Sequence, residues 1–382
     1  MARLSFSATP RDISQRSHCI PPVAHNGTIC AVTATAINKQ MQTLRTKMNS
    51  KTLLSRLSRW VLSVFPCFLV VLFGIEFAAQ AQTPTPTPPD EPNLPPSEAL
   101  PPQYQPSAYD TGNPTILERV RFVPTSGGPT WPAVLLIHPG GFHTGDQYGP
   151  KGLRQAAKDL IDSGYLVFSV DYRLAPPDTI NGQPDHSDPT SGRPPQQSND
   201  IKQQVLAARN DSQCNGTVFA VGGSAGGTHA VWAALDPAQT VPGWNGNQLV
   251  KAAVSLSGAY DFSDWRGQGV DPDVDHFIDV VTNYTNKSDS ATLKSLSPVA
   301  LVTSSVIKPL FLITSESDPM PPQEWQDMLD TLSQHGVPMG SYQSIKILGS
   351  ALHAFDYWHS LDAPGGQRIS KDVIDFLNAH LN

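Results

Sequence analysis

The stretch Thr217-Val218-Phe219-Ala220-Val221-Gly222-Gly223-Ser224-Ala225-Gly226-Gly227 decides which fold we predict for this chain of 382 residues. An apolar run leads into a Gly-x-Ser-x-Gly turn, and residues 228–235 then have the composition of a helix. Strand, sharp turn and helix form the context that exposes a nucleophilic serine at the end of a strand. A Cβ at Gly222 or Gly226 would collide with the strand or helix beside such a turn. The alternative is a plain glycine-rich turn, or a phosphate site.

Apolar runs and helix-like segments alternate along the chain from residue 116 onward. Strands are predicted at 116–123, 133–137, 165–170, 251–257, 310–314 and 344–348, and helices at 153–161, 200–209, 324–332 and 369–381. This alternation predicts an α/β fold with a doubly wound, mostly parallel sheet. The segments 176–197 and 261–298 do not fit the alternation. Long irregular segments often cover a site, so we expect 261–298 to form a small insertion near the site, with surface decoration as the alternative.

The first 108 residues divide into three segments by composition. Residues 1–47 show no clear hydrophobic period, and we interpret them as an upstream extension, with translation starting at Met41 or Met48. Residues 48–81 combine basic residues, an apolar run and a small-residue site, which is typical of a secretory signal peptide cleaved after Ala81. An uncleaved membrane anchor is the alternative. Residues 82–108 are a proline-rich linker that we place outside the fold, which leaves 109–382 as the catalytic domain.

Charge and cysteine content exclude several classes of protein. The net charge is −7 and 15% of the residues are charged, so no basic excess favours nucleic acid as a partner. Three of the four cysteines precede residue 82, and Cys214 is left alone, which excludes a disulfide framework in the mature chain. His138 and His143 could form a metal pair, but no third ligand is placed. We therefore expect no metal and no cofactor, and composition does not decide the oligomeric state.

Candidate partners of Ser224 follow three other predicted strands. His138-Pro139-Gly140-Gly141-Phe142 comes after 133–137, and its glycines can direct N–H groups at an oxyanion. Asp318 and Glu316 follow 310–314 as candidate acids, and the prolines that fix the turn favour Asp318. His353 follows 344–348 and is preferred over the other ten histidines for that position. In parallel sheets such groups gather at the carboxyl ends of the strands.

These motifs, with Asp171-Tyr172-Arg173-Leu174-Ala175-Pro176, resemble those of α/β-hydrolases of the hormone-sensitive-lipase-like and acetyl esterase-like carboxylesterase group. The order Ser224, Asp318, His353 is the order of the triad in that fold. The resemblance implies eight strands, and oxyanion-hole N–H groups from Gly140, Gly141 and Ala225. It also implies that Asp171 and Arg173 are structural. The family loop usually reads His-Gly-Gly-Gly; here Pro139 replaces the first glycine, and the two donors follow it.

We therefore predict a secreted or periplasmic serine carboxylesterase that hydrolyses short-chain acyl esters through an acyl-enzyme. Its substrate is a small-molecule or polysaccharide-borne ester, with no nucleic acid and no stable membrane association after cleavage. The alternatives are an acetyl-xylan or feruloyl esterase, an amide-cleaving formamidase or peptidase, and an inactive hydrolase fold that binds ligands. Aromatic residues that flank strand ends are predicted to line an acyl pocket, with ordinary core as the alternative: Phe142, Tyr260, Trp265, Phe355 and Trp358.

Overall fold

A computed structural model describes residues 94–110, 115–176, 192–265, 274–304 and 308–381. Contacts divide the chain into Met1–Thr87 and Pro88–Asn382, and every described residue lies in the second unit. The predicted extension, signal peptide and first part of the linker therefore lie outside the described residues, as does most of 176–197. In the described ranges, no helix is both long and apolar enough to cross a membrane.

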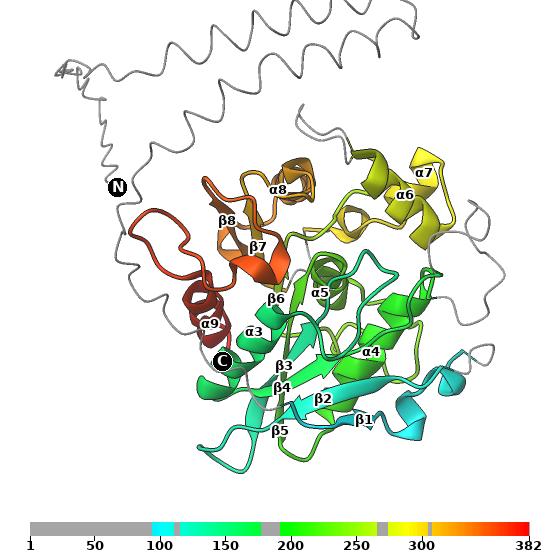
Figure 1. The fold of residues 1–382 in the computed structure, drawn as a ribbon. Helices are drawn as coiled ribbons and strands as arrows, with labels where there is room; N and C mark the ends of the chain where they lie inside the picture. Colours follow the sequence, from blue (N-terminus) through cyan, green and yellow to red (C-terminus); the bar gives the residue numbers. More distant parts are fainter. Residues whose placement is uncertain (1–93, 111–114, 177–191, 266–273, 305–307, 382) are drawn as a thin grey trace, which may run out of the picture. The chain divides into compact units, whose positions relative to one another are not determined.

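An eight-stranded sheet organises the unit (Figure 1), with the strand order β1-β2-β4-β3-β5-β6-β7-β8. Its strands are β1 (Ser97–Ala99), β2 (Glu118–Phe122), β3 (Trp131–Ile137), β4 (Leu166–Val170), β5 (Cys214–Gly223), β6 (Ala253–Leu256), β7 (Leu310–Ser315) and β8 (Tyr342–Ile347). Strands β3 to β8 all run parallel to one another, and β2 is antiparallel to both β1 and β4. The predicted α/β architecture with a mostly parallel sheet is confirmed.

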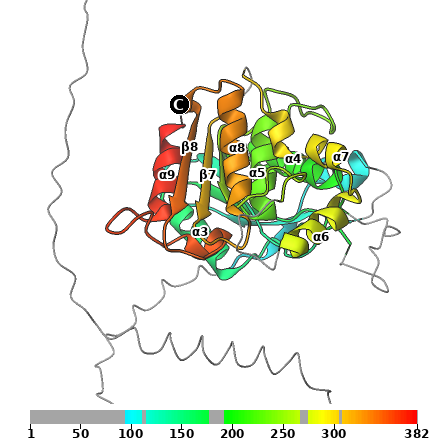
Figure 2. The same ribbon diagram turned by 90° about the horizontal axis from the view of Figure 1, so that it is seen from above.

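Helices cover both faces of the sheet, which explains why its central strands are continuous apolar runs. On one face pack α4 (Gln196–Arg209), α5 (Ala225–Leu235) and α8 (Pro322–Gln334). On the other face pack α3 (Lys151–Asp162) and α9 (Ile369–Ala379). Figure 2 shows α8 and α9 on opposite sides of β7 and β8. Each crossover returns the chain to the same sheet edge, so the loops after the parallel strands meet there.

The prediction that residues 82–108 lie outside the fold is wrong for the described end of that segment. Residues 97–99 form β1 and pair with β2, from Ser97 opposite Val120 to Ala99 opposite Glu118. The next residue, Leu100, is buried against Leu117. A proline-rich chain is already extended, and a short edge strand tolerates prolines beside it because one side of it needs no partner. The folded domain therefore begins before residue 109.

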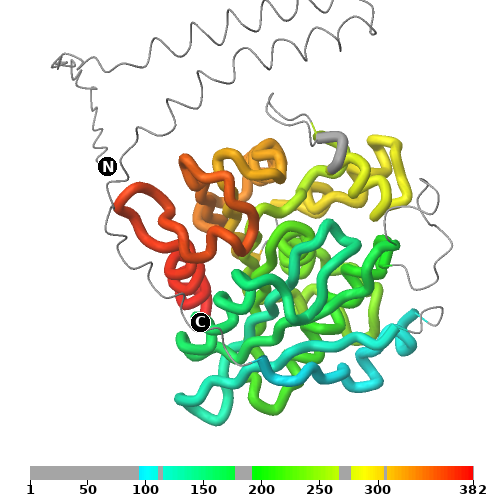
Figure 3. The backbone as a smooth tube through the Cα atoms, viewed as in Figure 1, coloured from blue at the N-terminus to red at the C-terminus, as the bar shows by residue number. Residues whose placement is uncertain are grey.

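The described residues of the predicted insertion, 261–265 and 274–298, contain two helices and the start of a short turn. They are α6 (Val274–Thr285), α7 (Ser290–Ser295) and the 3-10 turn Pro298–Leu301, drawn in yellow in Figure 3. Val280, Val281 and Tyr284 of α6 pack in one apolar cluster with Phe142 and Ala225. The insertion therefore rests on the loop after β3 and on the start of α5, where the predicted site residues lie.

Candidate active site

Ser224 occupies a strained turn between β5 and α5. Its backbone has φ 54° and ψ −123°, a conformation that non-glycine residues rarely adopt and that is common at functional sites. Its N–H donates to the carbonyl of Leu256 on the neighbouring strand at 2.7 Å. The turn is tight, since a Cβ at Gly222 would lie 2.0 Å from the carbonyl oxygen of Gly226. A Cβ at Gly226 would lie 2.2 Å from the carbonyl oxygen of Ile137.

Asp318 and His353 form a hydrogen-bonded pair at the ends of β7 and β8. Asp318 Oδ1 lies 2.7 Å from His353 Nδ1 and also accepts the N–H of Met320 at 2.9 Å. The Asp318 side chain is fully buried, whereas 26% of the His353 side chain is exposed. Because a carboxylate only accepts, Nδ1 carries the proton and Nε2 can take another. The second candidate acid, Glu316, is exposed and instead accepts the N–H of Gly349 at 2.7 Å.

Ser224 and His353 line the same cavity, of about 700 Å³. Among the residues that the structure describes, no hydrogen bond joins the serine hydroxyl to the imidazole. Such bonds are often long without substrate and tighten in the complex with substrate. The structure therefore brings all three predicted triad residues to one place, with the acid and the base already paired.

The predicted oxyanion donors line this cavity as well. Gly140 has φ 136° and Gly141 has φ 57°, both values that favour glycine. A Cβ at Gly140 would lie 2.0 Å from the carbonyl oxygen of Thr144, whose N–H donates to the Gly140 carbonyl at 2.9 Å. Ala225 is the first residue of α5, where N–H groups have no acceptor within the helix. The positive end of the helix dipole adds to its attraction for an anion.

Backbone strain is concentrated around the site. Of the five non-glycine residues with positive φ among those described, four belong to it: Phe142, Ser224, Ser257 and Ala354. Each such residue costs about 1–3 kcal/mol and persists only where its surroundings hold it. Ser257 was missed by the sequence analysis, although its place at the end of a predicted strand was a usable signal. Its hydroxyl donates to Asp318 Oδ2 and accepts the N–H of Ala354.

The structure places two of the predicted pocket aromatics on the cavity wall, Phe142 and Trp265. Among the further apolar residues that line it are four that the sequence did not single out: Phe277, Val280, Val281 and Met320. The ring of Trp265 stacks on that of Phe277, with centroids 6.0 Å apart. The insertion therefore supplies most of an apolar wall beside Ser224.

Tyr260 and Phe355 do not line the cavity, and the prediction for them is corrected. The Tyr260 ring is buried in the core, where its hydroxyl donates to Ser255 Oγ at 2.7 Å. The Phe355 ring packs under the turn, since a Cβ at Gly223 would lie 2.8 Å from it. Trp358 is also core and donates its indole N–H to Asp159 at 2.9 Å. An aromatic ring next to a strand end can turn toward the core or toward the site, and these rings turn toward the core, where more of their surface is buried.

His138 lies buried in the cavity wall behind the oxyanion loop. Burial lowers its pKa to about 4, so its ring is neutral at pH 7. The ring stacks on Tyr172 at 4.3 Å and its Nδ1 lies 2.8 Å from the Pro139 carbonyl. Within the described ranges, no group of three or more possible ligands could hold a metal ion. The ring thus shapes the loop through packing.

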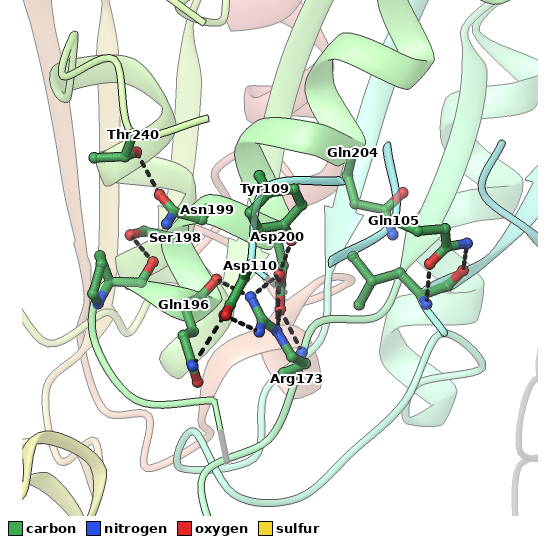
Figure 4. A network of polar contacts seen from close by, with 12 residues as sticks. Gln105, Tyr109, Asp110, Arg173, Gln196, Ser198, Asn199, Asp200, Gln204 and Thr240 are labelled. Atoms are coloured by element: carbon green, nitrogen blue, oxygen red, sulfur yellow. Dashed lines mark hydrogen bonds and ion pairs between the residues drawn. The ribbon is translucent and has the colours of Figure 1, made fainter. Parts of the chain in front are cut away.

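A buried ion-pair network braces the segment after β4 (Figure 4). Arg173 contacts Asp200 through Nη2 at 2.7 Å and Asp110 through Nη1 at 2.6 Å. The Tyr109 hydroxyl also donates to Asp200. Two residues after Arg173, the N–H of Ala175 donates to the Phe142 carbonyl at 2.8 Å. The resemblance implied a structural Arg173, and the network holds the segment that supports the oxyanion loop.

The model of the BD-FAE family matches residues 122–332, more than half of the chain. The chain belongs to the BD-FAE family. The match includes Ser224, Asp318 and the oxyanion loop, and it ends before His353 and the last strand. A comparison with curated proteins found no match for this BD-FAE protein.

Three solved structures similar to this BD-FAE protein are named as esterases. A truncated carbohydrate esterase from gut microbiota has 15% identity and a TM-score of 0.53, covering 76% of this chain and 98% of its own. A hyperthermophilic esterase from the archaeon Pyrobaculum calidifontis has 21% identity and a TM-score of 0.53, covering 75% and 83%. Thermogutta terrifontis esterase 2 phosphonylated by sarin has 15% identity and a TM-score of 0.52, covering 78% and 97%. These likenesses confirm the α/β-hydrolase fold.

Proposed function

We propose that this BD-FAE protein is a serine carboxylesterase that hydrolyses short-chain acyl esters through an acyl-enzyme. One observation carries the proposal: a histidine paired with a buried carboxylate shares a cavity with a serine on a strained elbow. A serine hydroxyl is a weak nucleophile and needs a base that is oriented in this way. The esterase names of the structural neighbours support the same reaction class.

The residues divide the reaction into two steps. Ser224 Oγ attacks the ester carbonyl carbon while its proton passes to His353 Nε2, and N–H groups of Gly140, Gly141 and Ala225 hold the oxyanion. The ester C–O bond then breaks, and the leaving alkoxide takes the proton from His353. In the second step water attacks the acyl-enzyme with His353 as base, which releases the acid and restores Ser224. Asp318 stabilises the imidazolium in both steps.

The cavity lining has an apolar part and a polar part, which suit different halves of an ester. The apolar wall of Trp265, Phe277 and Val280 suits a short acyl chain. The loop from residue 138 to 150 adds polar groups to the lining, including His143, Thr144 and Asp146. These suit an alcohol that carries hydroxyls. A second candidate is therefore an acyl-polysaccharide esterase, favoured by these polar groups and by the carbohydrate esterase among the neighbours.

Secretion is part of the proposal and rests on the pattern of residues 48–81. N-terminal sequencing of the exported protein is expected to start at Gln82. A mature protein that keeps residues 1–40 would contradict both the proposed start of translation and the cleavage. We propose a small-molecule or polysaccharide-borne ester as the ligand, with no cofactor.

One experiment tests the activity and the substrate class together. The exported protein is assayed with p-nitrophenyl esters of graded chain length, acetylated xylan, a feruloylated oligosaccharide and a matched arylamide. We expect turnover of short esters, and loss of about 10⁴-fold or more in Ser224→Ala. Unchanged turnover in that variant would contradict the mechanism. Faster turnover of the arylamide than of every ester would contradict the esterase assignment, and preference for the xylan would select the second candidate.

A further inference from the structure

The side chain of Gln197 connects the oxyanion loop to the nucleophile helix. It lies in the first turn of α4 and is fully buried. Its Nε2 donates to the Phe142 carbonyl at 2.7 Å, and its Oε1 lies 2.8 Å from His229 Nε2. Phe142 directly follows the two glycines of the loop, and His229 lies on α5, which begins at Ala225. One amide thus contacts both elements that supply oxyanion donors.

The hydrogen-bond pattern fixes the orientation of each group. A carbonyl only accepts, so the Gln197 NH₂ must face Phe142 and its oxygen must face His229. His229 therefore carries its proton on Nε2. Burial lowers the pKa of His229 to about 3, which keeps the ring neutral and this donor in place at ordinary pH. The Phe142 ring lies edge-on to the His229 ring, with centroids 5.7 Å apart, and closes the contact.

The Phe142 carbonyl needs this support because its backbone is strained. Phe142 has φ 67°, a value that costs a bulky residue about 1–3 kcal/mol. Its carbonyl accepts two hydrogen bonds, from the N–H of Ala175 and from Gln197. If one is lost, the loop can relax and turn the preceding glycine N–H groups away from the position of the oxyanion. Such donors act only when they are within about 2.7–3.1 Å of that atom.

We propose that Gln197 is a positioning residue for catalysis: its amide holds the oxyanion loop against the nucleophile helix. This inference rests on the proposed function, since it assigns a task to the same site. An amide is the side chain that fits, because it offers a donor and an acceptor on one plane. Met matches its size but has no donor, and Glu donates only when protonated.

The same helix offers a matched control in Gln203. It is also fully buried, and its amide has no hydrogen-bond partner among the described residues. We expect Gln197→Met to lower kcat about 10- to 100-fold on a p-nitrophenyl ester and to change KM less than threefold. Gln203→Met is expected to stay within twofold in kcat. Thermal unfolding of both variants shows whether each is folded.

Two further readouts separate positioning from a packing role. The Ki of a trifluoromethyl ketone, whose adduct places an oxyanion in the hole, should rise in Gln197→Met by the factor by which kcat/KM falls. The rate of Ser224 labelling by a fluorophosphonate should fall in Gln197→Met and stay near that of wild type in Gln203→Met. Labelling needs no ester turnover, so it tests the role of Gln197 even if the wild-type protein cleaves no ester. Absence of ester cleavage by the wild type would contradict the proposed function but not the role of Gln197.

Gln197→Glu supplies a pH readout. Titratable rings surround this contact: His229 and Tyr284 lie against Phe142, Tyr172 lies against His229, and His138 stacks on Tyr172. Burial lowers the pKa of both histidines, to about 3 and 4, and raises the pKa of both tyrosines, so none of them titrates between pH 6 and 8. A buried Glu has a raised pKa, so its proton restores the donor at low pH. We expect the ratio of kcat in Gln197→Glu to kcat in wild type to be higher at pH 6 than at pH 8.

The proposal is overturned by any of three results. The first is a folded Gln197→Met protein that keeps kcat and the labelling rate within twofold of wild type. The second is an equal loss in Gln197→Met and Gln203→Met, which would show that replacing any buried amide of α4 lowers the activity. The third is a rise in KM alone, with kcat and the ketone Ki unchanged.

Discussion

The hydroxyl of Ser257 donates a hydrogen bond to Oδ2 of Asp318, the carboxylate oxygen that His353 does not use. The same hydroxyl oxygen accepts the N–H of Ala354 at 3.0 Å, and Ala354 directly follows the base in the chain. The hydroxyl oxygen of Tyr357 also lies 3.0 Å from the hydroxyl oxygen of Ser257. A single serine, itself held at φ 55°, thus joins the turn of the acid to the loop of the base.

We expect Ser257→Ala to lower kcat about 10-fold on a p-nitrophenyl ester. Without this hydroxyl, Asp318 loses a hydrogen-bond donor and the N–H of Ala354 loses its acceptor, so the acid and the base are held less firmly in place. The measurement is steady-state kinetics of the variant and the wild type. Ser255→Ala is the control, because it removes a buried hydroxyl of β6 that contacts Tyr260 instead. A kcat of Ser257→Ala within twofold of wild type would contradict this role.

The apolar wall of the cavity is expected to set acyl length. Phe277 belongs to this wall and comes from the insertion, so truncation of Phe277 to Ala enlarges the cavity at its apolar wall. We expect Phe277→Ala to raise the ratio of kcat/KM for octanoate over acetate esters about 10-fold, since added methylenes gain a place to bind. Ile278→Ala, on the exposed side of α6, should leave the ratio unchanged. Equal changes in both variants would place the acyl chain elsewhere.

The elbow is expected to tolerate no side chain at Gly226. An added Cβ would overlap the Ile137 carbonyl at 2.2 Å, and backbone atoms of a central strand cannot move away. We expect Gly226→Ala to cost about 3 kcal/mol or more, which corresponds to a fall in Tm of roughly 6–12 °C. Gly340→Ala is the control, because nothing lies within 4 Å of its added Cβ. Thermal unfolding followed by circular dichroism compares the two.

The buried Arg173 network should respond strongly to loss of its cation. Arg173→Met leaves the fully buried Asp200 without its charged partner, and breaking a buried pair typically costs about 3–5 kcal/mol. Asp110→Asn removes the partner that is 27% exposed, and should cost about 1 kcal/mol or less. Urea unfolding measures both. Equal losses would show that Asp110, and with it the chain before β2, carries most of the stabilisation.

Much of the fold could be predicted because its signals are local. Strands β3, β4 and β7 are buried on both faces and read as continuous apolar runs. The triad could be predicted because each member follows such a run, and parallel strands end at one edge. The prediction for β1 failed because three residues in a proline-rich segment carry no period. Its pairing with β2 depends on tertiary contacts alone.

The residues that support the catalytic groups could not be predicted, for a different reason. Gln197 and Ser257 are polar residues of ordinary composition, and their importance comes from burial and from partners distant in the sequence. A sequence gives no sign that a glutamine in the first turn of a helix faces inward. Tyr260 and Phe355 illustrate the same limit, because proximity to a strand end does not fix which way a ring turns.

The stability of the protein should depend on pH through Asp171. Burial, together with the nearby charges of Asp200 and Glu118, raises the pKa of Asp171 to about 8, although its Oδ1 accepts the Glu118 N–H. The unfolded chain releases this proton near pH 4, so the folded state binds one proton more between pH 4 and 8. The contribution of Asp171 to the free energy of unfolding is therefore largest below pH 4 and is lost as the pH rises from 4 to 8.

Asp171→Asn removes this dependence and keeps an oxygen that can accept the Glu118 N–H. We expect its Tm to match that of wild type near pH 4 and to exceed it by about 2–4 °C at pH 8–9. Thermal unfolding at closely spaced pH values measures the difference, and the exposed Asp162→Asn serves as the control. A difference that stays constant with pH would show that Asp171 is already ionised in the folded protein. The charge near β2 would then be held by neighbouring donors rather than neutralised by a proton.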